Sequence, residues 1–168
     1  TISDVERIAD HAVNVGKAAL EMEEKKIVFS QQAQGELEVL ERAISDILGR
    51  TVEAYRSFAR ELARKVEPQE QVVDALVREI KSRHICRLRE GTCSVEYGFV
   101  LEDLLTAFER SADHCSNVAV EILQVSEGKL EAHGYLNSLK AGELQESAAF
   151  AEEYARYQAR YAFPEDQK

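Results

Sequence analysis

A near-heptad apolar pattern runs without interruption through residues 33–62, in the first half of the sequence. Apolar side chains recur there at steps of three and four, which is the period of one face of a helix. The residues of this face are Ala33, Leu37, Leu40, Ile44, Ile47, Thr51, Tyr55, Phe58 and Leu62. Ser30 precedes the pattern and is the expected N-cap. A pattern of this length is typical of a long antiparallel helical bundle.

The remaining apolar residues predict helices before and after this one. A first helix ends near Lys25, and its expected apolar face is Val5, Ile8, Ala12, Val15 and Ala19. A third helix begins at Pro68, which a first helical turn accommodates, and ends where Gly91 supplies a left-handed cap. A fourth spans about 94–125, with the apolar face Leu101, Leu105, Phe108, Ala112, Cys115, Ala119 and Ile122. A short segment around 135–140 and a last helix from about Leu144 follow, the latter with the aromatic edge Phe150, Tyr154, Tyr157 and Tyr161.

The composition agrees with an all-α fold and narrows the classes of partner. The 168 residues include only two prolines and no tryptophan, whereas sheet proteins need more turn residues. A net charge of −10 leaves little room for a basic patch, so we expect no nucleic-acid partner. No apolar run is long enough to insert into a membrane, and three cysteines without a Cys-x-x-Cys pair indicate a reducing compartment. Because the chain begins at Thr1 within a helical pattern, we expect it to be a fragment.

One acid-rich motif occurs twice in the chain. Residues 6–15 read ERIADHAVNV and residues 109–118 read ERSADHCSNV, so seven of ten positions match. Such a match indicates an internal duplication. In each copy the glutamate and the aspartate are four residues apart, so both carboxylates lie along one line of a helix, beside its apolar face.

A third pair with the same spacing occurs near the start of the third helix. The residues of the three pairs are Glu6 and Asp10, Glu70 and Asp74, and Glu109 and Asp113. Two acids at this spacing repel each other, so an arginine from a neighbouring helix or a cation must offset them. If the third helix packs beside the fourth, four carboxylates share one site. Such sites suit hard cations such as Fe³⁺, Mg²⁺, Mn²⁺ or Ca²⁺, with Zn²⁺ as a further option.

Two other interpretations stay open at this stage. In a metal-free helical scaffold, the same acids would form interhelical ion pairs with Arg7, Arg87 or Arg110. A di-metal oxidase of the ferritin type would need Glu-x-x-His pairs, and none of the four histidines has a glutamate three residues before it. The sequence contains no phosphate-binding glycine loop, serine-nucleophile motif or zinc-protease motif, so we expect that this chain is not an enzyme.

The two motif copies resemble the third-helix signature of PhoU-type domains, which occurs once in each of two three-helix repeats. The stretch RHICRLREGTC at 83–93, with Asp103-Leu-Leu and the tyrosine-rich end, is similar to the PhoU-like cytoplasmic domain at the C-terminal end of bacterial sodium/phosphate cotransporter family proteins. The resemblance implies an all-α antiparallel bundle in three parts. These are the last helix of a truncated first repeat (1–27), a complete three-helix repeat (28–126) and a C-terminal tail helix (127–168).

The resemblance also implies a function and a ligand set. PhoU-type proteins regulate phosphate transport and homeostasis, are not enzymes, and bind iron or zinc clusters through Glu/Asp-x-x-x-Asp motifs. Carried over by position, the metal ligands are Glu6, Asp10, Glu70, Asp74, Glu109 and Asp113, with His11, His114, Asn14 and Asn117 as accessory candidates.

The implied partner is the membrane domain of the transporter, in the same polypeptide, or other phosphate-uptake machinery. The domain would then lie in the cytoplasm, tethered to the inner face of the cell membrane. The missing part would be the membrane helices and the first two helices of the first repeat. A first helix without those partners exposes apolar surface, so we also expect homo-oligomers.

Overall fold

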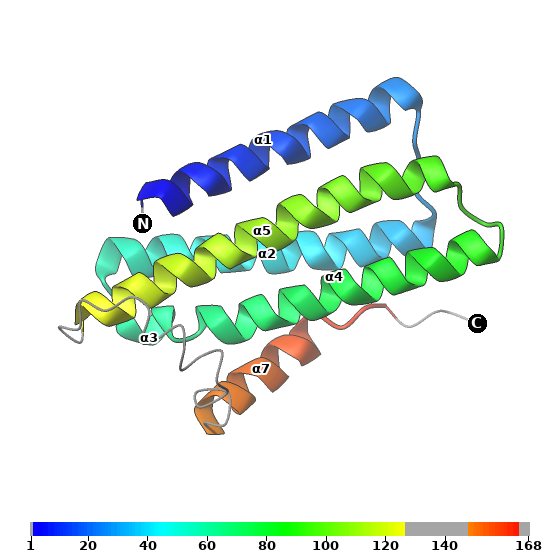
Figure 1. Cartoon of the computed structure of the whole chain (residues 1–168). Helices are drawn as coiled ribbons and strands as arrows, with labels where there is room; N and C mark the ends of the chain where they lie inside the picture. The colour runs from blue at the N-terminus through cyan, green and yellow to red at the C-terminus, as the bar shows by residue number, and fades with distance from the viewer. Residues whose placement is uncertain (1, 127–147, 165–168) are drawn as a thin grey trace.

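The computed structural model describes residues 2–126 and 148–164, and every regular element in these ranges is a helix (Figure 1). The helices are α1 (Ile2–Lys25), α2 (Gln31–Ser57), α3 (Arg60–Ala63), α4 (Val66–Arg89), α5 (Val95–Ser126) and α7 (Ala148–Arg160). The prediction of an all-α antiparallel bundle is confirmed. The expected segment around 135–140 and the expected start of the last helix near Leu144 lie outside the described residues.

The core lies between α2, α4 and α5, each of which packs against the other two. Leu40, Ile47, Ile80 and Leu105 are completely buried there, and full burial of such a side chain stabilises the fold by about 1.5–3 kcal/mol. The predicted apolar face of the fourth helix is buried at every position, which confirms its 3.6-residue period.

The helix ends follow local sequence signals. The Ser30 hydroxyl accepts a hydrogen bond from the Ala33 amide at 3.3 Å and caps α2 as expected. Gly91 has φ +70° just after α4, and the amide of Thr92 donates to the Arg87 carbonyl at 3.0 Å across that turn. This is the left-handed cap that favours glycine.

The predicted apolar face of the second helix is wrong beyond Thr51. The helix ends at Ser57, Phe58 is left-handed with φ 49°, and the chain turns into the short α3 before Leu62. Tyr55 and Phe58 are exposed and stack on each other, whereas Ala54 is buried. Ala54 lies three heptads after Ala33, so the buried face keeps the 3.5-residue repeat, and the predicted step of four from Thr51 to Tyr55 departed from it.

The predicted face of the first helix is also partly wrong. Ile8 packs against the core as expected, but Val5, Ala12 and Ala19 are exposed and Ala18 is buried in their place. Among the described helices α1 contacts α5 alone, at the edge of the bundle (Figure 1). The face that α1 packs against α5 is therefore narrower than the predicted apolar face and is rotated around the helix axis relative to it.

Helix α7 packs on α4 and is anchored by Tyr157 and Tyr161, both buried. The Tyr161 hydroxyl donates to the Asp46 carboxylate at 2.7 Å and accepts from the Gln69 amide nitrogen at 3.0 Å. Burial, with Asp46 next to it, raises the pKa of Tyr161 above its ordinary value. The phenol is thus a neutral donor that joins the tail to α2 and α4.

Replacing Tyr161 by phenylalanine is expected to lower the free energy of unfolding by about 1–2 kcal/mol, because the buried Gln69 amide loses an acceptor. Urea denaturation followed by circular dichroism measures the change. Tyr154→Phe is the matched control, since its half-buried ring lies on α7, seven residues before Tyr161. Equal losses in the two variants would contradict an anchoring role for the Tyr161 hydroxyl.

A buried ion pair ties α2 to α4. Glu36, only 1% exposed, accepts two hydrogen bonds from the Arg87 guanidinium at 2.8 and 2.9 Å. Arg83 approaches the same carboxylate at 3.5 Å, and the ring of Phe163 covers the Arg83 guanidinium with 4.8 Å from its carbon to the ring centroid. Such a bidentate geometry fixes the register of the two helices.

Candidate metal site

Three of the predicted ligands meet where α4 packs on α5. Glu70 and Asp74 lie one turn apart on α4, and Asp113 faces them from the second motif copy on α5. One carboxylate oxygen from each residue lies within 4.8 Å of the other two. All three side chains are half-buried. The i, i+4 spacing of the first pair and the packing of the two helices therefore produce the expected convergence.

The carboxylates of this cluster repel one another, and nearby positive charge does not offset that repulsion. Burial, followed by the charges of Glu67, Asp74 and Asp113, raises the pKa of Glu70 from 4.5 to about 9. Burial, followed by Glu109 and Asp113, also raises the pKa of Asp74. The fourth predicted ligand, Glu109, is thus close enough to act on Asp74, although it is not one of the three converging residues.

The cations around the cluster are distant or exposed. Arg78 stands 3.9 Å from Asp74, Arg110 stands 3.4 Å from Asp113, and Lys81 stands 4.0 Å from Glu109. The arginines lie on the same helices as their acids and are mostly exposed, so each stabilises by only a few tenths of a kcal/mol. Arg87 is one of the arginines expected to pair with these acids in a metal-free scaffold, but it forms its ion pair with Glu36 instead.

One acceptor at the site has no partner. Asp74 Oδ1 is buried and makes no hydrogen bond within the described part of the chain. An unsatisfied buried acceptor costs about 1–3 kcal/mol, and more when it is charged. A cation among the three carboxylates would satisfy this atom and lower the mutual repulsion. The donor set consists of oxygen atoms only, so it fits a hard cation better than Zn²⁺.

Glu67 is a further acid at this site that the sequence patterns did not identify. Its carboxylate accepts hydrogen bonds from the Ser116 hydroxyl and, at 3.4 Å, from the Gln71 amide. It contributes to the raised pKa of both Glu70 and Asp74. The signal was present in the sequence, because Glu67 precedes Glu70 by three residues and shares its side of α4.

The accessory histidines lie between the two motif copies rather than among the acids. His11 stacks on His114 with ring centroids 5.6 Å apart, so the copies on α1 and α5 face each other. Burial, followed by the charge of His114, lowers the pKa of His11.

A polar contact beside the stacked rings fixes the same interface. Asp4 Oδ1 lies 3.0 Å from His114 Nδ1 and accepts from the Asn117 amide at 3.2 Å. Burial tends to raise the pKa of Asp4, but these hydrogen bonds outweigh it and the pKa is lowered. Two accessory candidates of the second copy thus bind an acid of α1 that the motif comparison did not single out.

The acids of the first copy are placed differently. Glu6 and Asp10 are exposed on α1, as is Asn14, and the only described helix that α1 contacts is α5. No acid from a second helix joins Glu6 and Asp10 within the described residues. The two copies of the motif are therefore alike in sequence and different in surroundings.

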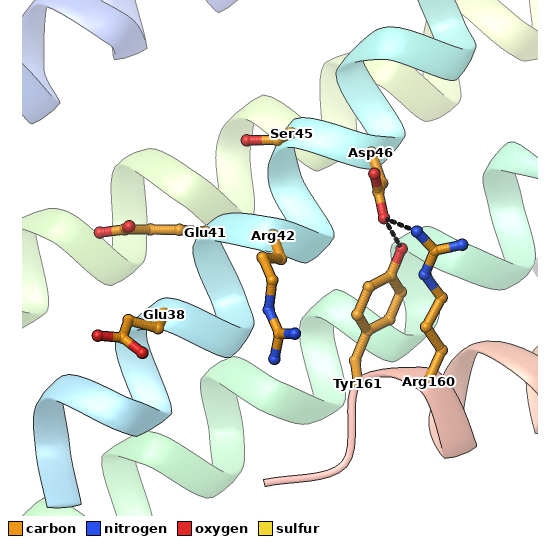
Figure 2. Close-up of a pocket in the computed structure, with 7 residues that line it drawn as sticks. All are labelled: Glu38, Glu41, Arg42, Ser45, Asp46, Arg160 and Tyr161. Carbon is orange, nitrogen blue, oxygen red and sulfur yellow. Dashed lines mark hydrogen bonds and ion pairs between the residues drawn. The ribbon is translucent and has the colours of Figure 1, made fainter.

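A separate open cleft of about 620 Å³ lies between α2 and the end of α7. Its lining is Glu38, Glu41, Arg42, Ser45, Asp46, Arg160 and Tyr161 (Figure 2). Asp46 is already bound by Arg160 at 2.7 Å and by the Tyr161 hydroxyl. The cleft is thus part of the seam that holds the tail, and its mixed charges favour no ligand class.

Comparisons with known proteins give the family. A model of the PhoU domain matches residues 37–122. The phosphate-specific transport system accessory protein PhoU homolog 1 of Thermotoga maritima is 29% identical over 134 residues, which is 76% of this chain and 54% of that protein. The chain thus spans about half the length of this relative. No solved structure gave a significant match, and no helix in the described residues is long and apolar enough to cross a membrane. Because the domain model covers more than half of the sequence, including the second motif copy, the chain belongs to the PhoU family.

Proposed function

We propose that this chain is a non-catalytic regulatory domain of phosphate transport and homeostasis, and that a metal held between α4 and α5 controls its contacts with other proteins. The observation that carries the proposal is the convergence of Glu70, Asp74 and Asp113 around a buried oxygen without a hydrogen-bond partner. The accessory role in phosphate transport of the Thermotoga maritima relative supports the process.

The residues that would hold the metal are Glu70, Asp74 and Asp113, with Glu109 beside them. The metal would supply positive charge that offsets the repulsion of these carboxylates. Of the two metals that the family resemblance implies, iron as Fe³⁺ fits this oxygen-only set better than zinc does. Loading would then change the charge of the surface that α4 and α5 present to a partner.

The partner in this proposal is a membrane transporter for phosphate, either a sodium/phosphate cotransporter in the same polypeptide or separate uptake machinery. The domain would lie on the cytoplasmic side, tethered to the inner face of the membrane. Residues 1–27 would be the last helix of a first repeat, 28–126 a second repeat and 127–168 a tail. We also propose that the chain forms homo-oligomers, since large apolar side chains of α1 are exposed.

Metal analysis of protein purified without chelator or nickel resin tests the site. We expect at least one equivalent of iron in the wild type and its loss in Glu109→Ala/Asp113→Ala, since that variant removes two of the four carboxylates of the site, both from α5. Glu6→Ala/Asp10→Ala is the matched control, because it makes the same two changes in the exposed motif copy. The control is expected to keep its metal.

A competing proposal is a metal-free scaffold held by interhelical ion pairs, and the buried pair between Glu36 and Arg87 favours it. Substoichiometric metal in the wild type would select the scaffold. Metal lost from the control variant but kept by the Asp113 variant would place the site on α1 and contradict the proposed ligands.

A further inference from the structure

A buried histidine near the end of α4 faces a thiol. His84 is only 7% exposed, and its Nδ1 atom lies 3.7 Å from the sulfur of Cys93. Its Nε2 atom is buried and has no hydrogen-bond partner in the described part of the chain. An unsatisfied buried polar atom costs about 1–3 kcal/mol. The fold therefore keeps an imidazole against a thiol at a cost in stability, which a purely apolar side chain at this position would avoid.

The connection between α4 and α5 fixes both partners. A Cβ at Gly98 would lie 2.8 Å from His84 Nε2, so glycine at this position leaves the room that the ring occupies. Cys93 lies two residues before α5, and the Ser94 hydroxyl between them accepts a hydrogen bond from the Tyr97 amide at 3.4 Å. The sulfur thus stands at the amino end of a helix of 32 residues. The dipole of such a helix stabilises negative charge there, including that of a thiolate.

The charges around His84 keep its ring neutral. Burial, followed by the positive charge of Arg87, lowers the pKa of His84, and the opposing effect of Glu36 is smaller. At neutral pH the imidazole is therefore uncharged and can accept a proton from a neighbouring thiol. A cysteine whose thiol proton is taken up by a histidine is the arrangement that proteins use to make sulfur nucleophilic.

The other two cysteines have different surroundings. Cys115 is completely buried in the core, and burial raises its pKa to about 11, so it is expected to be inert. Cys86 is exposed on α4 and makes no hydrogen bond to a histidine within the described residues. Cys93 is half-buried, so its sulfur is open to small molecules and has the imidazole beside it. The three thiols of the chain therefore provide their own comparison.

We infer that Cys93 is a site of reversible thiol modification, which reacts with small disulfides while His84 accepts its proton. The sulfur attacks one sulfur of the disulfide, whose S–S bond breaks as a new S–S bond forms to Cys93. The thiol proton passes to His84 Nδ1 and then to the departing thiolate. The disulfide is itself the oxidant, so no further reactant is needed. The proposed metal site is separate, because His84 lies ten residues after Asp74, about 15 Å along α4.

Stopped-flow absorbance with dithiodipyridine, a small disulfide that releases a coloured thione, tests the site on the whole 168-residue chain. Cys86→Ser and Cys93→Ser are the matched variants, because each leaves one accessible thiol. At neutral pH we expect the Cys93 thiol to react roughly tenfold faster than the Cys86 thiol, although Cys86 is more exposed. Mass spectrometry of the intact protein counts the groups added. A Cys93 thiol that reacts no faster than the Cys86 thiol overturns the inference.

A pH profile tests the role of His84. In the Cys86→Ser background, His84→Gln is expected to slow the reaction roughly tenfold at neutral pH, because the thiol loses its proton acceptor. Above about pH 9.5 a cysteine thiol ionises without a base, so the two rates are expected to converge. Rates that differ by the same factor at every pH would mean that the ring only shapes the site, and would overturn its role as proton acceptor. The comparison of the two thiols leaves His84 unchanged, so it decides the inference even if His84→Gln unfolds.

Discussion

Replacing Glu36 by alanine is expected to lower the free energy of unfolding by about 3–5 kcal/mol, because the Arg87 guanidinium would stay buried without its partner. Both side chains are less than a tenth exposed, and both nitrogen–oxygen contacts are shorter than 3 Å. Desolvation of an unpaired charge therefore dominates the effect. Urea denaturation followed by helical circular dichroism at neutral pH measures it.

Two further variants separate the charge from the packing. Glu79→Ala removes an acid that pairs with Arg83 at the surface, so it is expected to cost less than about 1 kcal/mol. Glu36→Leu/Arg87→Met replaces the whole pair by apolar residues and is expected to recover most of the loss. A loss for Glu36→Ala no larger than that for Glu79→Ala would mean that the pair does not hold α2 on α4.

The second large effect is a pH dependence carried by Glu70 in protein treated with chelator. The pKa of Glu70 rises from 4.5 to about 9 on folding, chiefly through burial. Between these values the folded state binds a proton that the unfolded state has released. The free energy of unfolding is therefore expected to fall as pH rises from about 4.5 to about 9, by about 2 kcal/mol after allowance for solvent at this half-buried site.

Glu70→Gln should remove that slope, because an amide has no proton to lose while its shape is nearly that of the protonated acid. The difference between wild type and variant isolates Glu70 from other groups that titrate nearby. His11 and His84 have lowered pKa values, so they contribute a slope of the opposite sign at mildly acidic pH in both proteins. Parallel stability curves for the two proteins from pH 5 to 9 would rule out a buried, protonated Glu70.

The buried face of a helix could be predicted from the sequence where the helix has a single apolar stripe. Every residue predicted for the buried face of α5 is buried, because α5 lies in the centre of the bundle and its apolar stripe is unambiguous. The face of α1 could not be predicted, since its apolar residues cover two sides and only tertiary packing selects Ala18 over Ala12 and Ala19. The predicted end of α2 was wrong for a different reason, because Tyr55 and Phe58 are large apolar residues near the face and were preferred to Ala54, which holds the heptad position.

The acids of the site could be predicted from the sequence, but the ion pairs and hydrogen bonds between helices around it could not. The four-residue spacing predicts Glu70, Asp74 and Asp113 as ligands from the sequence alone, and the packing of α4 on α5 brings them together. No pattern in the sequence singles out Glu36, because its partner Arg87 lies 51 residues away in the sequence. The sequence patterns did not identify Asp4 either, since its hydrogen-bond partners His114 and Asn117 lie 110 and 113 residues away in the sequence. Spacing predicts pairs within one helix, whereas pairs between helices depend on the fold.

The single contact between α1 and α5 has a consequence for the native ensemble. Among the described helices α1 packs on α5 alone, while α2, α4 and α5 pack on one another, so in a molecule of these residues α1 opens locally at a lower free energy than the core does. Its backbone amides would then exchange with solvent at a lower free energy than those of the core. Asp4 on α1 binds Asn117 and also His114, the residue next to Asp113, so each such opening breaks hydrogen bonds beside the acidic cluster.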